Sequence, residues 1–436
     1  MANIEKRGDS YRIKVCVGYD SKGKKITQST TYHPEYTTRT GKVKAESVIQ
    51  KELERYAAEF ERKVKNGDLL AESNMKFSEL VERYLKEYAY MELTTATAEG
   101  YETYLRNKLL PHFGHFKVAD LCRQTMNIQT FYNDTAKKAG DERALASSTI
   151  NRHITIFSSV MRWAVDMHIA PNNPLTRVKP PRTQYKKPTP KSFTLEELNR
   201  FIQALELPQT ATYKAHKRTL KGGTTYSVPE YTETRFLSEQ FKLFYIMAAF
   251  SGCRRSELIA LDWSDFNFDK GTINISKTVS KTSKGIIVKE TKTSSGTRVI
   301  NMPVSVMDLA KRWRTHQQEE RLKLGTFWKG IDNVFCQADG TRMYPDTVSA
   351  KFKDVILNYN SQCQPNDKLP EITLHGLRHT SASILIYQNT DIATVSKRLG
   401  HSKTSVTLDI YTHAIAEADK TAANTLDIIA KNAGIS

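Results

Sequence analysis

The spacing of apolar residues divides the chain into segments with different predicted structures. Residues 11–17 alternate between polar and apolar side chains, which is typical of a half-buried β-strand. A polar turn rich in lysine follows, and a second strand-like segment covers residues 26–32. Residues 42–65 are highly charged and carry apolar residues at helical spacing. We therefore predict a small module of strands and one helix over residues 1–66.

Residues 76–177 follow the period of amphipathic helices. Apolar side chains recur three and four residues apart, first from Phe77 and again from Ile150. The hydroxyl residues at 147–149 are typical of a helix N-cap region, and prolines from Pro171 onward end the last helix. This pattern predicts an all-α bundle.

The rest of the chain mixes both patterns. The sequence from Thr194 to Glu197 predicts a capping box, residues 241–250 an apolar helix, and residues 272–302 several strands, before helices resume at His375. Residues 208–235 fit either an inserted hairpin or a disordered loop. The predicted fold class is multidomain α+β, with a sheet-plus-helix module, an all-α bundle and, over residues 193–436, a mainly helical domain with a small antiparallel sheet.

Charge changes this picture by suggesting a partner. The chain has 65 lysines and arginines against 47 acidic residues, a net charge of +18. Such an excess favours a polyanion, although charge for solubility alone is the alternative. Arg12 and Lys14 fall on one face of the first strand, and a basic ribbon can enter a DNA groove. A solvated strand carrying lysines is the other interpretation.

A basic, proline-rich linker is predicted over residues 178–192. It contains four prolines and no acidic residue. Its basic residues are Lys179, Arg182, Lys186, Lys187 and Lys191. We expect this stiff tether to contact DNA, with a solvated interdomain linker as the alternative.

Other classes of protein fit the sequence poorly. The longest apolar run, residues 243–250, is far shorter than the roughly 20 residues of a bilayer span, and the N-terminus lacks an apolar signal core. The five cysteines are scattered, which suits neither a disulfide framework nor a zinc site. We expect a soluble, cytoplasmic protein without a metal or other cofactor.

Four short motifs in the last domain carry the candidate chemistry. They lie at residues 251–258, 289–298, 375–379 and 399–413, and the second reads as strand, turn and strand. They supply cations, imidazoles and one phenol: Arg254, Lys292, His375, Arg378, His401 and Tyr411. Each motif alone is a modest signal, whereas all four in this order form a specific pattern.

Together these motifs resemble the catalytic domain of tyrosine recombinases, the phage-integrase family, over residues 193 to about 423. The bundle resembles the family's core-DNA-binding domain, and residues 1–66 the arm-site-binding domain of integrases from temperate phages and conjugative transposons. The resemblance implies conservative strand exchange through a 3′-phosphotyrosyl link and a Holliday junction. It also implies a homotetramer on double-stranded attachment sites, a DNA-bending accessory protein or excisionase as further partners, and a bacterial, nucleoid-associated location.

The arginines suit the transition state of phosphodiester cleavage. Guanidinium groups are planar, permanently charged and bidentate, so Arg254 and Arg378 can clamp the non-bridging phosphate oxygens. His401 would donate a further hydrogen bond. Glu257, one turn from Arg254, is expected to orient that arginine.

Proton transfer needs three more groups. Tyr411 is the expected nucleophile, and because the pKa of a phenol is about 10, it needs a proton acceptor. His375 is placed to take that proton. Lys292, among other cations that should lower its pKa, is expected to protonate the leaving 5′ oxygen.

Several alternatives accompany this interpretation. His375 and His379 have the spacing of a metal pair but lack the glutamate of a zincin motif, so His379, like His413, is expected to be structural. Arg255 and Arg298 are expected at the surface or on the DNA backbone. The predicted helix over residues 414–430 docks either on a neighbouring subunit or on its own domain. A type IB topoisomerase and a non-catalytic DNA-binding regulator are the rival functions.

Overall fold

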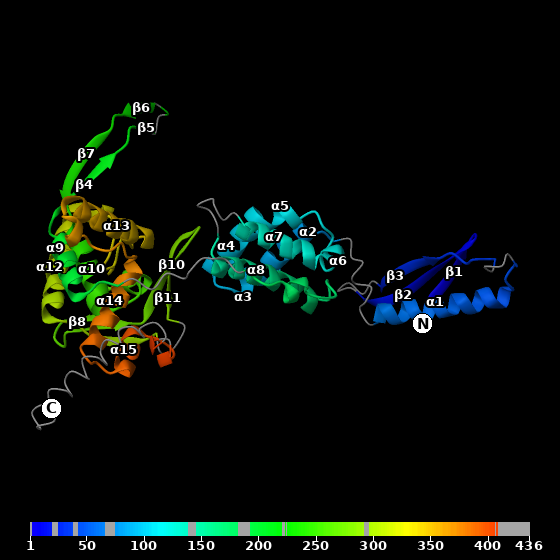
Figure 1. The fold of residues 1–436 in the computed structure, drawn as a ribbon. Helices are drawn as coiled ribbons and strands as arrows, with labels where there is room; N and C mark the ends of the chain where they lie inside the picture. Colours follow the sequence, from blue (N-terminus) through cyan, green and yellow to red (C-terminus); the bar gives the residue numbers. More distant parts are fainter. Residues whose placement is uncertain are drawn as a thin grey trace, which may run out of the picture. The chain divides into compact units, whose positions relative to one another are not determined.

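The protein is described here by a computed structural model, which resolves two compact units, Met1–Lys186 and Lys187–Ser436 (Figure 1). Helices and small antiparallel sheets make up both units, so the predicted α+β class is confirmed. No helix in the described parts of the chain is long and apolar enough to cross a bilayer. The residues described are 2–19, 25–37, 42–65, 75–137, 145–181, 192–219, 223, 225–291, 296–405 and 407–408.

The N-terminal module is a three-stranded antiparallel sheet with one helix. Strands β1 (Asn3–Arg7), β2 (Ser10–Tyr19) and β3 (Lys25–Tyr32) lie in that order, and α1 (Glu46–Lys65) packs against them. Ile13 and Val15 are buried in one cluster with apolar side chains of α1. Because side chains alternate along a strand, Arg12 and Lys14 lie on the other face.

A second hydrophobic cluster unites the helical bundle. The stripes that begin at Phe77 and Ile150 are buried as predicted, and Phe77 contacts Phe157 with ring centroids 5.0 Å apart. The helices are α2 (Phe77–Tyr84), η2 (Leu85–Ala89), α3 (Tyr90–Glu92), α4 (Thr95–Tyr104), η3 (Leu105–Leu109), α5 (Leu110–Phe113), α6 (Val118–Leu121), α7 (Thr125–Lys137), α8 (Ser147–Asp166) and η4 (Pro174–Arg177).

The predicted cap of α8 is wrong in detail. The N-cap is Ala146, which makes no side-chain cap, and the hydroxyl of Ser147 instead donates to the carbonyl of Pro181 at 3.2 Å. The segment that follows the bundle is also hydrogen-bonded to it at Lys179. Lys179 exchanges two backbone hydrogen bonds of 2.9 Å with the Gln129 side chain on α7.

In the second unit, α10 (Glu239–Ser251) is the central helix. Eight of its side chains are buried, including that of Lys242, because apolar residues surround the helix on all sides. The capping box of Thr194 and Glu197 is present as predicted. The other helices are α9 (Leu195–Ala204), α11 (Arg255–Ile259), η5 (Trp263–Asp265), α12 (Val304–Leu324), η6 (Gly325–Phe327), α13 (Pro345–Gln362), η7 (Pro365–Asp367), α14 (Leu374–Tyr387) and α15 (Ile392–Leu399).

The two strands that flank the second motif do not pair with each other. Strand β11 (Gly285–Glu290) pairs with β10 (Lys277–Thr282), whereas β12 (Arg298–Asn301) pairs with β9 (Thr272–Ile275), which also pairs with β8 (Phe266–Asn267). The second motif therefore connects two separate sheets instead of forming one hairpin.

Residues 208–236 form an inserted ribbon, so the hairpin interpretation holds for its described residues. Strand β4 (Pro208–Tyr213) pairs with β7 (Tyr231–Phe236), and β5 (His216–Thr219) pairs with β6 (Thr225–Val228). The ribbon extends away from the body of the unit near α13 (Figure 1).

Candidate active site

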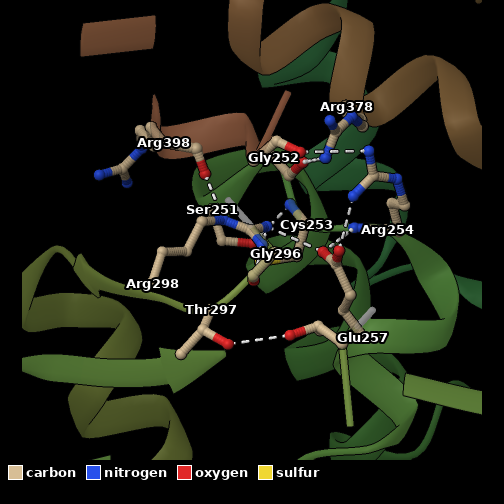
Figure 2. A network of polar contacts seen from close by, with 12 residues as sticks. Ser251, Gly252, Cys253, Arg254, Glu257, Gly296, Thr297, Arg298, Arg378 and Arg398 are labelled. Carbon is tan, nitrogen blue, oxygen red and sulfur yellow. Dashed lines mark hydrogen bonds and ion pairs between the residues drawn. The ribbon is translucent and has the colours of Figure 1, made fainter. Parts of the chain in front are cut away.

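The first motif forms a tight turn at the end of α10. Gly252 ends the helix with φ of +65°, and a Cβ there would lie 2.6 Å from Cδ2 of Leu399, so only glycine fits. The turn brings Arg254 to the start of α11. There its Nη1 donates to Oε1 of Glu257 at 2.8 Å, and its backbone N–H to Oε2 at 2.9 Å (Figure 2). Glu257 thus contacts Arg254 in the way expected from the sequence.

Glu257 is buried between two arginines. Its side chain is 3% exposed, and Oε2 also accepts from Nη2 of Arg298 at 2.8 Å. Burial by itself raises the pKa of this carboxyl, but hydrogen bonds from Arg298 and Arg254 outweigh burial and hold the pKa below its usual value. The carboxylate is therefore ionised at neutral pH.

The expectation that Arg298 lies at the surface is wrong. Arg298 is buried, and its position in β12 is in phase with the buried Ile300. That phase was a signal in the sequence, because alternate residues of a strand face one side. Lys277, another cation of the strand-rich residues 272–302, also has partners inside the protein, since it forms ion pairs with Asp262 and Asp265. Arg255 is exposed as expected and donates to Ser349 at 2.7 Å.

The third motif returns to the same turn. Arg378 on α14 is 3% exposed, and its Nη1 donates to the carbonyl of Gly252 at 2.8 Å. His375 is the second residue of the same helix and is exposed, and its ring lies perpendicular to that of His379 with the centroids 5.0 Å apart. Partial burial of the ring, and then the charges of Arg378 and Arg254, lower the pKa of His375.

The fourth motif supplies His401 from the turn after α15. Gly400 ends that helix with φ of +72°, and its carbonyl accepts from Nη2 of Arg254 at 3.4 Å. Burial and the charges of Arg378 and Arg254 lower the pKa of His401 to about 4. Its Nδ1 lies 2.8 Å from the hydroxyl of Thr407, a fully buried residue that the sequence analysis missed.

Three motifs that are far apart in the sequence therefore meet at one place. The carbonyls of Gly252 and Gly400 bind the two arginines, and two neutral histidines lie within reach of the arginines' charges. Such a site can bind an anionic group such as a phosphate, because guanidinium groups supply positive charge and paired donors. The neutral imidazoles can each donate one hydrogen bond or accept a proton.

Several predicted residues lie outside the described part of the chain. Among these are two members of the candidate site, Lys292 and Tyr411. The others are Arg182, Lys186, Lys187, Lys191, His413 and the predicted helix over residues 414–430. The described residues that flank Lys292 are close to each other, because the hydroxyls of Thr291 and Thr297 are 2.9 Å apart.

Two family models match the chain. The model described as "Phage integrase family" matches residues 227–418. The model described as "Phage integrase, N-terminal SAM-like domain" matches residues 76–135. The matched regions include the first half of the helical bundle and every described member of the candidate site.

Similar proteins span comparable lengths. A "Tyrosine recombinase XerC-like" protein of Caldanaerobacter subterraneus is 26% identical over 98% of both chains. The ICEBs1 integrase of Bacillus subtilis is 27% identical over 66% of this chain and 67% of its own. A structure of the Tn1549 transposon integrase in complex with circular intermediate DNA has a TM-score of 0.58 at 18% identity, and the match covers 81% of this chain and 100% of that one. This last similarity shows a shared fold.

Proposed function

We propose that Tyr411 attacks a phosphodiester that arginine and histidine side chains hold, and that DNA is cleaved and rejoined in this way. The chain belongs to the phage integrase family of tyrosine recombinases. The chain is a site-specific DNA recombinase that acts in the integration and excision of a mobile element. The observation that supports this assignment of residues is the convergence of Arg254, Arg378 and His401 around the turn at Gly252.

Arg254 and Arg378 would stabilise charge on the non-bridging oxygens. Glu257 holds Nη1 of Arg254, yet the side chain of Arg254 remains 42% exposed and can still receive a phosphate. Arg378 lies deeper and is bound to a backbone carbonyl. Removing one such preorganised donor typically lowers the rate by about 10²–10³.

In the cleavage step, the phenol oxygen of Tyr411 forms a bond to phosphorus while the bond from phosphorus to the 5′ oxygen breaks. The phenol proton passes to His375, whose lowered pKa leaves its ring neutral and able to accept at pH 7. Lys292 supplies a proton to the 5′ oxygen. The products are a 3′-phosphotyrosine and a free 5′ hydroxyl, and attack by a 5′ hydroxyl of another strand reverses the step.

The remaining segments would bind the DNA flanking the cleavage point. We assign residues 1–66 to the binding of arm sites through Arg12 and Lys14, and residues 76–177 to the binding of the core site. Residues 178–192 would be a basic linker that contacts DNA, and residues 193–436 would carry out catalysis. Lys14 binds the exposed Glu5 at 3.0 Å, and a phosphate can displace this carboxylate. We further infer a homotetramer on two duplexes, an accessory DNA-bending protein or excisionase, and action at the bacterial nucleoid.

The test is covalent attachment to a nicked attachment site, whose sequence is obtained from the junctions between the element and its chromosome. Wild-type protein should remain joined to DNA on a denaturing gel, and Tyr411→Phe should not. If wild-type protein binds the verified site but neither protein is attached, the regulator alternative is correct. If wild-type protein relaxes supercoiled DNA but never joins two attachment sites, the topoisomerase alternative is correct.

A further inference from the structure

Arg298 lies beside Glu257, and it bonds to two distant segments of the chain and to its own segment (Figure 2). Its Nε donates to the carbonyl of Arg398 at 2.7 Å, and its Nη1 to the carbonyl of Gly296 at 3.0 Å. Its Nη2 donates to Oε2 of Glu257 at 2.8 Å and lies 3.5 Å from the sulfur of Cys253. All three guanidinium nitrogens are therefore used inside the protein.

Each of these segments carries a member of the candidate site. Glu257 holds Arg254. The carbonyl of Arg398 lies three residues before His401. Gly296 follows the segment that contains Lys292, and the Thr291–Thr297 contact brings the described flanks of that segment together.

We propose that Arg298 is a positioning residue for strand cleavage: it ties the described end of the segment that carries Lys292, at Gly296, to the segments that carry Arg254 and His401. The inference rests on the proposed function. Arg298 itself is 5% exposed at its side chain, so it acts through the groups it binds and does not touch DNA.

Arg298 has two separable roles. Its charge neutralises Glu257, which is buried and ionised. Its planar fork spreads its donors over three separate nitrogens, whereas the three donors of a lysine ammonium share one nitrogen and cannot span the same acceptors. Arg298→Lys therefore keeps the counter-charge for Glu257 but loses the simultaneous contacts with Gly296 and Arg398.

The experiment compares two DNA substrates of the same nicked attachment site. One has an ordinary phosphodiester at the cleavage point, and the other has sulfur in place of the bridging 5′ oxygen. Because the pKa of a thiol is near 8.5, the sulfur leaves without a proton and does not need Lys292. Single-turnover formation of the covalent complex is measured for each protein.

We expect Arg298→Lys to cleave the ordinary substrate about 10- to 100-fold more slowly than wild type, since small misplacements of catalytic groups have effects of this size. On the sulfur substrate, its rate should return to within a few-fold of wild type. Lys292→Ala should show the same selective rescue. Arg298→Met, which also removes the counter-charge, should be slow on both substrates.

The matched control is Arg342→Lys. Arg342 is another poorly exposed arginine of the same unit, and it donates to the carbonyls of Ile259 and Leu261 and to Asp262. Arg342→Lys should lose stability but keep the wild-type ratio of the two rates.

The proposal is overturned if Arg298→Lys cleaves both substrates at wild-type rates, or is equally slow on both while its thermal unfolding matches that of Arg342→Lys. Either result would show that Arg298 does not act on cleavage through the segment that carries Lys292. Failure of the proposed function looks different, because wild-type protein would then form no covalent complex with either substrate.

Discussion

The hydroxyl of Thr407 lies 2.8 Å from Nδ1 of His401, and Thr407 is completely buried. When this hydroxyl donates to Nδ1, the ring proton of the neutral histidine resides on Nε2. Nε2 can then donate a hydrogen bond to a phosphate oxygen. Thr407 is therefore placed to select the tautomer of His401 that the proposed mechanism requires.

Replacing Thr407 with valine should slow covalent attachment to DNA. Valine has the same shape but no hydroxyl, so both tautomers of His401 become available, and we expect a loss of about 10-fold, below the 10²–10³ typical for deleting a donor outright. Thr407→Ser retains the hydroxyl and should stay close to wild type. Single-turnover cleavage measures both, and equal rates for valine and wild type would exclude this role.

Acidification from pH 7 to pH 4 should destabilise the second unit through its half-buried histidines, His379 and His401. Burial lowers the pKa of His401 and of His379 to about 4, while unfolded histidine titrates near 6.5. In this window the unfolded chain binds more protons than the folded chain, so the free energy of unfolding falls as pH decreases. The loss should be on the order of 1–2 kcal/mol for each histidine, after allowing for partial exposure.

Urea unfolding at pH 7, 6 and 5 measures this effect. His379→Gln should flatten the pH dependence relative to wild type, and an unchanged slope would contradict the assignment. Glu257 does not interfere, because its pKa is lowered in the folded chain: its stabilising contribution is fully present above the ordinary pKa of a carboxyl and is lost only as the pH falls below that value.

Glu257→Gln should weaken both stability and cleavage. The substitution leaves Arg298 buried without its counter-charge, and breaking a buried pair in this way costs about 3 kcal/mol or more. Cleavage should fall because Arg254 loses its charged partner. Urea unfolding and single-turnover attachment provide the readouts.

Two comparisons give this prediction its controls. Adding Arg298→Met to Glu257→Gln should cost less than the sum of the single changes, because the two side chains contact each other. Glu320→Gln removes an exposed pair with Lys323 and should change neither quantity. Additive losses would mean that the pair does not act as a unit.

Gly252→Ala should be more harmful than the same change at another left-handed glycine. Its Cβ would meet Leu399 at 2.6 Å and the hydroxyl of Ser381 at 3.2 Å, and the shift would move the carbonyl that binds Arg378. Gly223 also has a positive φ, +83°, but a Cβ there would meet no atom within 4 Å. Gly223→Ala should therefore cost only the backbone strain of roughly 1–2 kcal/mol. Thermal unfolding and cleavage should both separate the two variants, and equal effects would contradict the close contact.

Arg12→Ala should reduce binding to arm-site DNA in a salt-dependent way. If Arg12 neutralises one phosphate, its loss should lower the slope of log affinity against log salt by about 1. Lys51→Ala removes the same charge from an exposed position on α1 and should leave the slope unchanged. Identical slopes for wild type, Arg12→Ala and Lys51→Ala would show that Arg12 does not contact a DNA phosphate.

The sequence by itself determined the local elements and the chemical composition of the site. The strand around Ile13 and the helices that begin at Phe77 and Ile150 have the predicted type, because the period of apolar residues is set by local backbone geometry. The order of the four motifs predicted the phage integrase family, whose models match residues 76–135 and 227–418.

Only the tertiary structure decided which side chains support that site. Arg298 pairs with Glu257, Thr407 contacts His401, and β11 and β12 join different sheets. These features depend on pairing between residues that are far apart along the chain, and local periodicity carries no information about partners. A charge such as that of Arg298 is stable inside the protein because Glu257 and two carbonyls meet it there, and only the folded chain brings these groups together.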